Sequence, residues 1–138
     1  MKSHLIKSLI IPIILIPFII FANDSSSLKA DNPELLKMSK EINKQLPVKM
    51  NGVVFYGTSV KGNSLTFHYK WPGFAAGYPM AMVFQAGEDL MKNVCNNKAI
   101  QPYIDAGVTL FYNYRDQTMG EIYTAQVDKK TCEEFKTK

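Results

Sequence analysis

The longest apolar stretch of the chain lies near its N-terminus, where residues 9–22 carry no charged side chain. A short basic segment, residues 1–7, precedes this stretch, and Ala22 supplies a small residue at its end. This order is typical of a secretory signal peptide, so we expect cleavage after Ala22. The alternative is an uncleaved membrane anchor. The stretch is shorter than the ~20 residues of a spanning helix, however, and it contains Pro12 and Pro17.

A polar, serine-rich leader follows at 23–31, and the pattern of apolar residues then becomes helical. Asn32 suits the N-cap of a helix, and Pro33 suits the first helical position. Apolar residues recur every three or four positions until Pro47, which ends the pattern. They form one stripe that we expect to pack on a sheet: Leu35, Met38, Ile42 and Leu46.

Two pairs of strands are predicted, one on each side of a second helical region. Residues 53–60 and 64–71 flank a turn that contains Gly62, and the second of these segments alternates apolar and polar side chains. Residues 108–116 and 121–127 form a similar pair around a turn that contains Gly120. Each pair predicts an antiparallel hairpin, so we expect a sheet of about four strands.

The region between the hairpins predicts a pair of helices. Apolar residues in 80–95 have helical spacing, with Gly87 as a candidate interruption, and 98–106 predicts a shorter helix that ends before Gly107. Asp128 is a candidate cap for a last short turn at 128–132. This order predicts an α+β fold, in which an antiparallel sheet from two hairpins is covered by an N-terminal helix and a central helix pair.

Length and charge narrow the class of protein. A chain of 138 residues has room for one domain, which we place at 32–138. Loss of residues 1–22 removes Lys2 and Lys7, which leaves 14 basic against 12 acidic side chains and a net charge of +2. This near neutrality argues against nucleic acid or an anionic membrane as the partner.

The chain contains two cysteines, Cys95 and Cys132. In an oxidising compartment outside the cytoplasm, two lone cysteines most often pair as a disulfide. Two free buried thiols are the alternative. A redox-active pair is disfavoured because the two residues lack the C-x-x-C spacing.

Candidate catalytic and metal-binding residues are few. His68 is the only histidine beyond the predicted signal peptide, and no second histidine or cysteine stands at metal-ligand spacing from it. Serines that could complete a Ser-His-Asp triad exist, but no G-x-S-x-G motif is present. The adjacent acidic pairs at 88–89 and 133–134 would diverge on a helix. We therefore expect no enzyme activity, no metal and no cofactor.

The segment between the first hairpin and the next helix is unusually apolar for a loop. It combines large side chains with Gly73 and Gly77, which give it freedom to adapt. Aromatic anchors and methionines are typical of adaptable protein-binding grooves. The candidate partner-binding residues are Trp71, Phe74, Tyr78, Met80 and Met82. The alternative is that the same side chains fill the core of the domain.

Three sequence motifs resemble those of the AspS-type (GspS-beta) type II secretion pilotins. The first runs from Leu35 to Pro47 and has the ending Asn-x-x-Leu-Pro. The second is Cys95 with a short helix and the Gly-Val-Thr-Leu sequence at 107–110, and the third is Asp-x-x-Thr-Cys at 128–132. The resemblance implies that family's α/β domain, a disulfide between Cys95 and Cys132, and binding of the C-terminal segment of a secretin.

One feature departs from that family, whose members are lipoproteins with a cysteine at the cleavage site. This chain has Ile20-Phe21-Ala22-Asn23 there, so we expect no direct lipid anchor. The resemblance therefore predicts a periplasmic, non-catalytic protein that binds a secretin segment or a related secretion component. The alternative is an exported inhibitor or effector domain, periplasmic or secreted, with an unrelated protein target.

Overall fold

The computed structural model describes residues 30–74 and 78–137 of the chain. The predicted signal peptide and the predicted leader up to residue 29 lie outside the described residues. In the part that is described, no helix is long and apolar enough to cross a membrane. A compact unit begins at Asp31 and contains every helix and strand named below.

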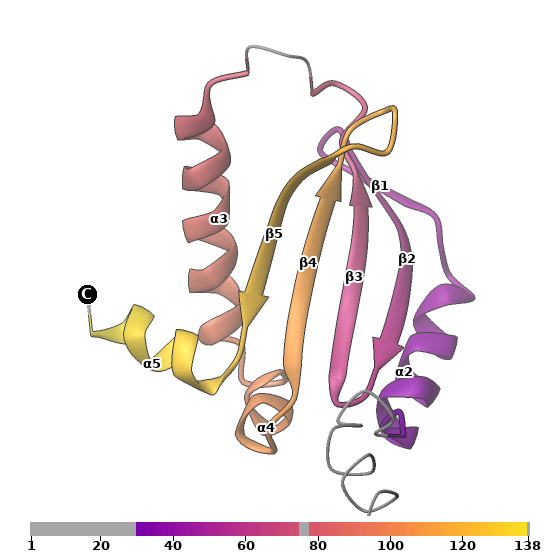
Figure 1. Ribbon diagram of the computed structural model, residues 1–138, viewed down its shortest axis with the longest axis vertical. Helices are drawn as coiled ribbons and strands as arrows, with labels where there is room; N and C mark the ends of the chain where they lie inside the picture. Colours follow the sequence, from indigo (N-terminus) through magenta and orange to yellow (C-terminus); the bar gives the residue numbers. More distant parts are fainter. Residues whose placement is uncertain (1–29, 75–77, 138) are drawn as a thin grey trace, which may run out of the picture. The chain divides into compact units, whose positions relative to one another are not determined.

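The unit has an α+β fold, as the sequence predicts. In chain order its elements are α2 (Pro33–Asn43), β1 (Val48–Met50), β2 (Val53–Lys61), β3 (Ser64–Lys70), α3 (Met80–Cys95), α4 (Gln101–Asp105), β4 (Thr109–Arg115), β5 (Glu121–Val127) and α5 (Lys129–Lys136). The strands form one sheet in the order β1-β2-β3-β4-β5 (Figure 1).

The sheet is mixed, which corrects the prediction of a purely antiparallel one. Both predicted hairpins are present, β2–β3 and β4–β5, but β3 and β4 lie side by side and run parallel. Between these strands the chain passes through α3 and α4, which return it to the end of the sheet where β3 begins (Figure 1). A crossover of this kind makes the two strands that it joins parallel.

The strand β1 is a further correction, because the sequence predicts only about four strands. It pairs with β2 through a turn in which the φ angles are positive, 47° at Asn51 and 81° at Gly52. The Asn-Gly pair favours such a turn, but the strand has only three residues, too few for alternation to appear. The first helix also ends at Asn43 rather than Leu46, so the segment that β1 uses is free to extend.

The helices contribute to one core on a single face of the sheet. Leu65, Leu110 and Val127 are neighbours across β3, β4 and β5 and are at most 4% exposed. Every helix adds at least one buried side chain to the same cluster: Leu35 from α2, Val94 and Cys95 from α3, Ile104 from α4 and Cys132 from α5.

The predicted apolar stripe of α2 packs on this face. Leu35 is buried and Met38 packs against the core, whereas Ile42 and Leu46 are half-buried. The stripe is therefore confirmed, and its N-terminal half is the better packed part.

Polar contacts fix the position of α2 on β2. Ser39 Oγ lies 2.7 Å from Thr58 Oγ1, and both side chains are buried. The Asn43 side chain accepts a hydrogen bond from the Thr58 amide at 2.8 Å and donates one to the Thr58 carbonyl at 3.1 Å. Apolar spacing does not reveal such partners, so the sequence pattern gave no indication of them.

The predicted disulfide is present between Cys95 at the end of α3 and Cys132 in α5. Both cysteines are buried. The N-terminus of α5 is closed by the predicted Asp128 cap, which forms a capping box with Thr131. α3 runs without a break through Gly87, which corrects the expected interruption.

Candidate functional site

Stacked aromatic rings cover the middle of the helix-bearing face of the sheet. Tyr69 stacks on Phe55 and on Tyr114, with 4.9 Å between ring centroids in each pair. Phe67 stacks on Tyr112 at 4.8 Å. The parallel register of β3 and β4 places these rings together, because Phe67 pairs with Tyr112 and Tyr69 pairs with Tyr114. We call these five rings the aromatic floor.

Helices flank the aromatic floor on two sides. α2 packs mainly against β2, and α3 packs mainly against β5. Figure 1 shows the two helices at opposite sides of the sheet. Phe55, Tyr69 and Tyr114 are consequently only half-buried, although they lie at the centre of the fold's apolar face.

Two of the hollows on this face of the sheet border the aromatic floor, one toward each end of it. The larger, of about 280 Å³, lies between α3 and the sheet and is lined by Val83, Leu90, Trp71, Tyr114 and Tyr123 among others. Apolar and aromatic side chains dominate its lining, as they do in ligand pockets generally.

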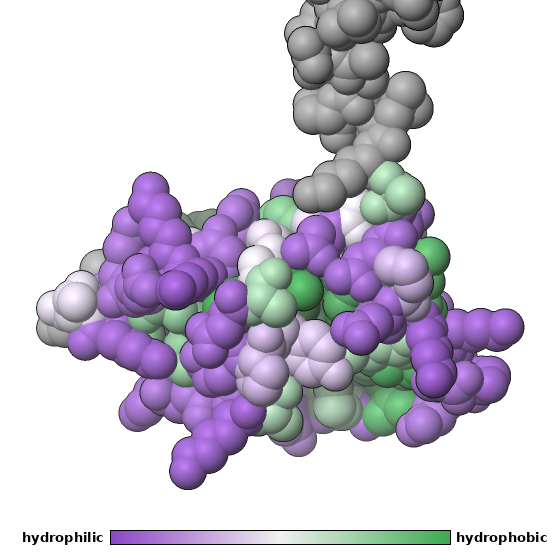
Figure 2. Space-filling model, turned by 90° about the horizontal axis from the view of Figure 1, so that it is seen from below, coloured by the Kyte–Doolittle hydropathy of each residue, from purple (hydrophilic) through white to green (hydrophobic). Residues whose placement is uncertain are grey.

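The smaller hollow, of about 80 Å³, lies between α2 and α4. Its lining includes Met38, Phe67 and Tyr103. At the end of the domain that carries α4, hydrophobic patches reach the surface between hydrophilic side chains (Figure 2).

Three of the five predicted binding residues meet in an aromatic trio, Trp71, Phe74 and Tyr78. The distances between their ring centroids are 5.7, 5.2 and 5.4 Å. Trp71 also lines the larger hollow, and its amide donates a hydrogen bond to the Arg115 carbonyl at 2.7 Å. All three rings are half-buried. Residues 75–77 lie outside the described residues.

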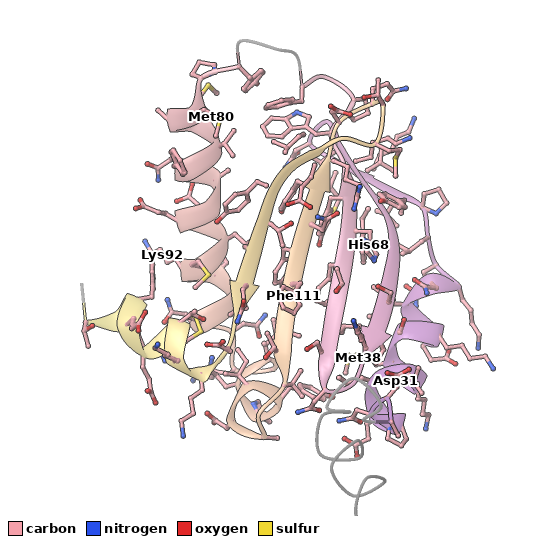
Figure 3. All side chains as sticks on the ribbon, viewed as in Figure 1. Asp31, Met38, His68, Met80, Lys92 and Phe111 are labelled. Carbon is pink, nitrogen blue, oxygen red and sulfur yellow. A yellow bond between two sulfur atoms is a disulfide. The ribbon has the colours of Figure 1, made fainter. Side chains whose placement is uncertain are left out.

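The other two predicted residues, Met80 and Met82, lie in the first turn of α3. Each is 52% exposed, and Figure 3 shows Met80 at the end of α3 where the chain enters the helix. Phe84, which the sequence analysis did not single out, is more exposed still. Its helical spacing of four from Met80 is the sequence feature that could have identified it.

The sequence analysis also missed the aromatic floor as a candidate site. It placed apolar rings on one face of each strand, but the contacts between Tyr69 and Tyr114 depend on which strands are neighbours. Tyr123 of β5 was missed for the same reason, because it meets Gly87 of α3 only in the folded domain.

The aromatic floor stays uncharged at physiological pH. Burial, with a contribution from neighbouring Tyr114, raises the pKa of Tyr112 to about 12. Burial likewise raises the pKa of Tyr69 and of Tyr114 above the usual tyrosine value. A neutral, mostly apolar surface with a few hydroxyl groups suits an apolar or amphipathic ligand better than a charged one.

His68 lies on the opposite face of the sheet from the aromatic floor. Its Nε2 atom is 2.7 Å from Ser59 Oγ. Burial and the positive charge of Arg115 lower the pKa of His68, which opposes formation of an imidazolium. Among the described residues, no carboxylate is hydrogen-bonded to His68, and no group of three His, Cys, Asp or Glu side chains could hold a metal ion.

The fold recurs in solved structures at low sequence identity. A candidate secreted protein from Pseudomonas aeruginosa superposes with a TM-score of 0.62 and 24% identity, over 78% of this chain and 99% of that chain. The type 2 secretion pilotin EpsS from Vibrio vulnificus gives a TM-score of 0.61 at 13% identity, over 72% of this chain and 88% of that one.

The type II secretion pilotin AspS from Vibrio cholerae gives a TM-score of 0.57 at 17% identity, over 71% of this chain and 88% of that one. No family model and no curated protein matches the sequence. At these identities the likeness shows a shared fold.

Proposed function

We propose that the protein is an exported, non-catalytic binding protein of the pilotin type, whose partner is a segment of a secretin or of a related secretion component. The fold shared with EpsS and AspS supports this proposal, as do the motifs that resemble AspS-type pilotins. The observation that carries it is the aromatic floor between α2 and α3, where four of the five rings are only half-buried. Exposed apolar surface of this kind is typical of a docking site.

An amphipathic helix is the occupant that suits the aromatic floor best. Such a helix presents apolar side chains at intervals of three, four and seven residues to a hydrophobic groove. The two hollows can each receive one of these side chains, because both open on the helix-bearing face. The neutral tyrosines of the floor can pair with polar positions of the helix through their hydroxyl groups.

The aromatic trio and the exposed methionines would contact one end of the bound segment. Trp71 borders the larger hollow, and Phe74 and Tyr78 extend the apolar surface away from it. Met80 and Met82 add flexible side chains beside the trio, and methionine adapts well to different apolar partners.

A periplasmic location supports the same function. The N-terminal sequence is typical of a secretory signal peptide, and a buried disulfide is characteristic of oxidising compartments. Solved structures that share this fold include two secretion pilotins and a candidate secreted protein.

The test is titration of the protein with a synthetic peptide from the C-terminal segment of the secretin encoded in the same genome. Trp71 is the only tryptophan of the chain and provides the fluorescence signal. Phe74→Ala and Tyr78→Ala should each raise the Kd at least about fivefold, which corresponds to about 1 kcal/mol. Phe111→Ala removes a ring from the opposite face and serves as the matched control.

Circular dichroism and chemical denaturation establish that each variant folds. If both trio variants fold and bind as tightly as the parent, the trio is not the contact surface. If the peptide fails to bind and a periplasmic pull-down recovers an enzyme or toxin instead, the secretin assignment is wrong and the protein is an exported inhibitor.

A further inference from the structure

The face of the sheet opposite the helices carries polar and basic side chains in regular rows. Leu65, Phe67 and Tyr69 point to the helices, so the alternate residues of β3 point to the other side. Figure 3 labels two residues of this side, His68 on β3 and Phe111 on neighbouring β4. Every described helix contributes to the core on the other side, and we call this uncovered side the open face.

One row of the open face is basic. Lys49 pairs with Val54 in the register of β1 and β2, Val54 pairs with Lys70, and Lys70 pairs with Arg115. Strands lie about 4.8 Å apart, so Lys70 and Arg115 are adjacent and Lys49 lies about 10 Å from Lys70. The row thus places three cations across the strands, from the edge strand β1 to β4, at the end of the sheet where β3 and β4 finish.

Among the described residues, none of the three cations forms an ion pair. The ion pairs in this part of the chain are Lys44–Glu41 and Lys130–Glu134, and neither pair belongs to the row. Glu121 lies opposite Arg115 in the register of β4 and β5, and its carboxylate accepts a hydrogen bond from Asn113. The Arg115 guanidinium donates hydrogen bonds to Asn113 Oδ1 at 2.8 Å and to the Met119 carbonyl at 2.9 Å, which uses two of its five N–H groups.

The neighbouring row supplies an aromatic ring and neutral polar groups. The ring of Tyr56 lies 5.9 Å from that of His68, which places Tyr56 on the open face. Asn113 and Thr124 continue the row and are joined by a hydrogen bond of 2.7 Å. Asn113 is only 6% exposed, so the surface beside the cations is formed by the half-buried Tyr56 ring and the exposed Thr124 side chain.

We propose that the open face binds an acidic polysaccharide, with its carboxylates on Lys49, Lys70 and Arg115 and a sugar ring against Tyr56. Ammonium and guanidinium groups form charge-assisted hydrogen bonds with carboxylates. Sugar hydroxyls match the neutral side chains of the next row. This site is separate from the aromatic floor, so it does not depend on the proposed secretin segment.

An acidic peptide suits the open face less well than a polysaccharide. Peptides that dock on sheets add a strand to an edge through main-chain hydrogen bonds. Lys49 lies on the edge strand β1, but Lys70 and Arg115 lie on the inner strands β3 and β4, whose backbone groups are already paired on both sides. Only side chains are offered there, which suits a ligand that binds through carboxylates and hydroxyls.

His68 provides a spectroscopic reporter for the site. Burial and Arg115 hold its pKa below the usual histidine value. A carboxylate bound at Arg115 and Lys70 would offset the positive charge that acts on His68, so the pKa should rise on binding. The His68→Gln variant identifies the resonance in spectra of the full chain.

The probe is oligogalacturonate, a carboxylated polysaccharide, with neutral dextran and poly-glutamate as comparison arms. Oligogalacturonate should bind, raise the His68 pKa, and bind more weakly as salt increases. The double variant Lys49→Gln/Lys70→Gln should raise the Kd at least about tenfold, because charge-assisted contacts are lost. Lys37→Gln/Lys40→Gln makes the same change in net charge on exposed positions of α2 and should change the Kd less than about twofold.

Three results would overturn the proposal. The first is no binding of oligogalacturonate. The second is equal weakening by the two double variants, which would mean attraction by net charge alone. The third is binding of poly-glutamate as tight as that of oligogalacturonate, which would make an acidic peptide the ligand.

Discussion

The substitution Gly87→Ala tests how α3 is held against the sheet beside the larger hollow. A Cβ atom at Gly87 would lie 2.6 Å from the hydroxyl oxygen of Tyr123 and 3.0 Å from its Cζ atom. The first distance is too short for a real contact and the second is tighter than most, so either the tyrosine ring or the helix must move. The glycine therefore permits the close approach of α3 to β5.

Two opposing effects set the size of the change in stability. Alanine is favoured over glycine in a helix interior by about 1 kcal/mol. An extra methyl group in a packed contact costs about 1–3 kcal/mol, and a clash with a ring belongs in the upper part of that range. We therefore expect Gly87→Ala to lower the free energy of unfolding by about 1–2 kcal/mol.

Urea denaturation followed by circular dichroism measures this effect. In a Tyr123→Phe background the closest atom is gone, so the cost of Gly87→Ala should fall by about 1 kcal/mol. Gly57→Ala is the matched control, because its Cβ atom would meet nothing within 4 Å. If Gly87→Ala stabilises the parent protein, Tyr123 does not press on α3 and the larger hollow has a different shape.

Three further predictions concern stability and charge. Leu35→Ala should lower the free energy of unfolding by about 2–4 kcal/mol, because Leu35 is 1% exposed. The control is Leu36→Ala, at a side chain that is 46% exposed, which should cost less than about 1 kcal/mol in the same denaturation assay. Reduction of the disulfide should lower the free energy of unfolding by about 3–4 kcal/mol, and two alkylatable thiols in the native protein would contradict its presence. The pKa of His68, measured by NMR, should lie below the usual histidine value of about 6.5, and Arg115→Gln should raise it. With its pKa lowered in the folded protein, His68 binds a proton more readily in the unfolded chain, so the folded protein should lose stability as the pH falls below about 6.5. A measured His68 pKa above about 6.5 would refute this prediction.

Local features of the fold could be predicted from the sequence because each depends on residues close together in the chain. The Asn32 cap and Pro33 start α2 as expected, and Asp128 starts α5. Alternation along β3 assigns its apolar and polar faces correctly. The disulfide could be expected from two cysteines in a chain whose N-terminal sequence predicts export.

The pairing of β3 with β4 could not be predicted from alternation, because parallel and antiparallel strands alternate in the same way. What decides the direction is the crossover through α3 and α4. The same pairing creates the aromatic floor, since it stacks Tyr69 on Tyr114. Without this pairing the aromatic floor could not be found, whereas the three residues of the aromatic trio are close together in the sequence and could be grouped from it.

The two proposed surfaces share one strand, and this makes their independence testable. On β3, Tyr69 faces the aromatic floor while Lys70 faces the opposite side. Side chains of adjacent strand residues do not touch through the sheet, so Lys70→Gln should leave affinity for the secretin peptide within about twofold of the parent. Tyr69→Ala removes a ring from the floor and should weaken that peptide without weakening oligogalacturonate by more than about twofold. If either variant weakened both ligands while the fold stayed intact, the ligands would share one site, and the assignment of two separate faces would be wrong.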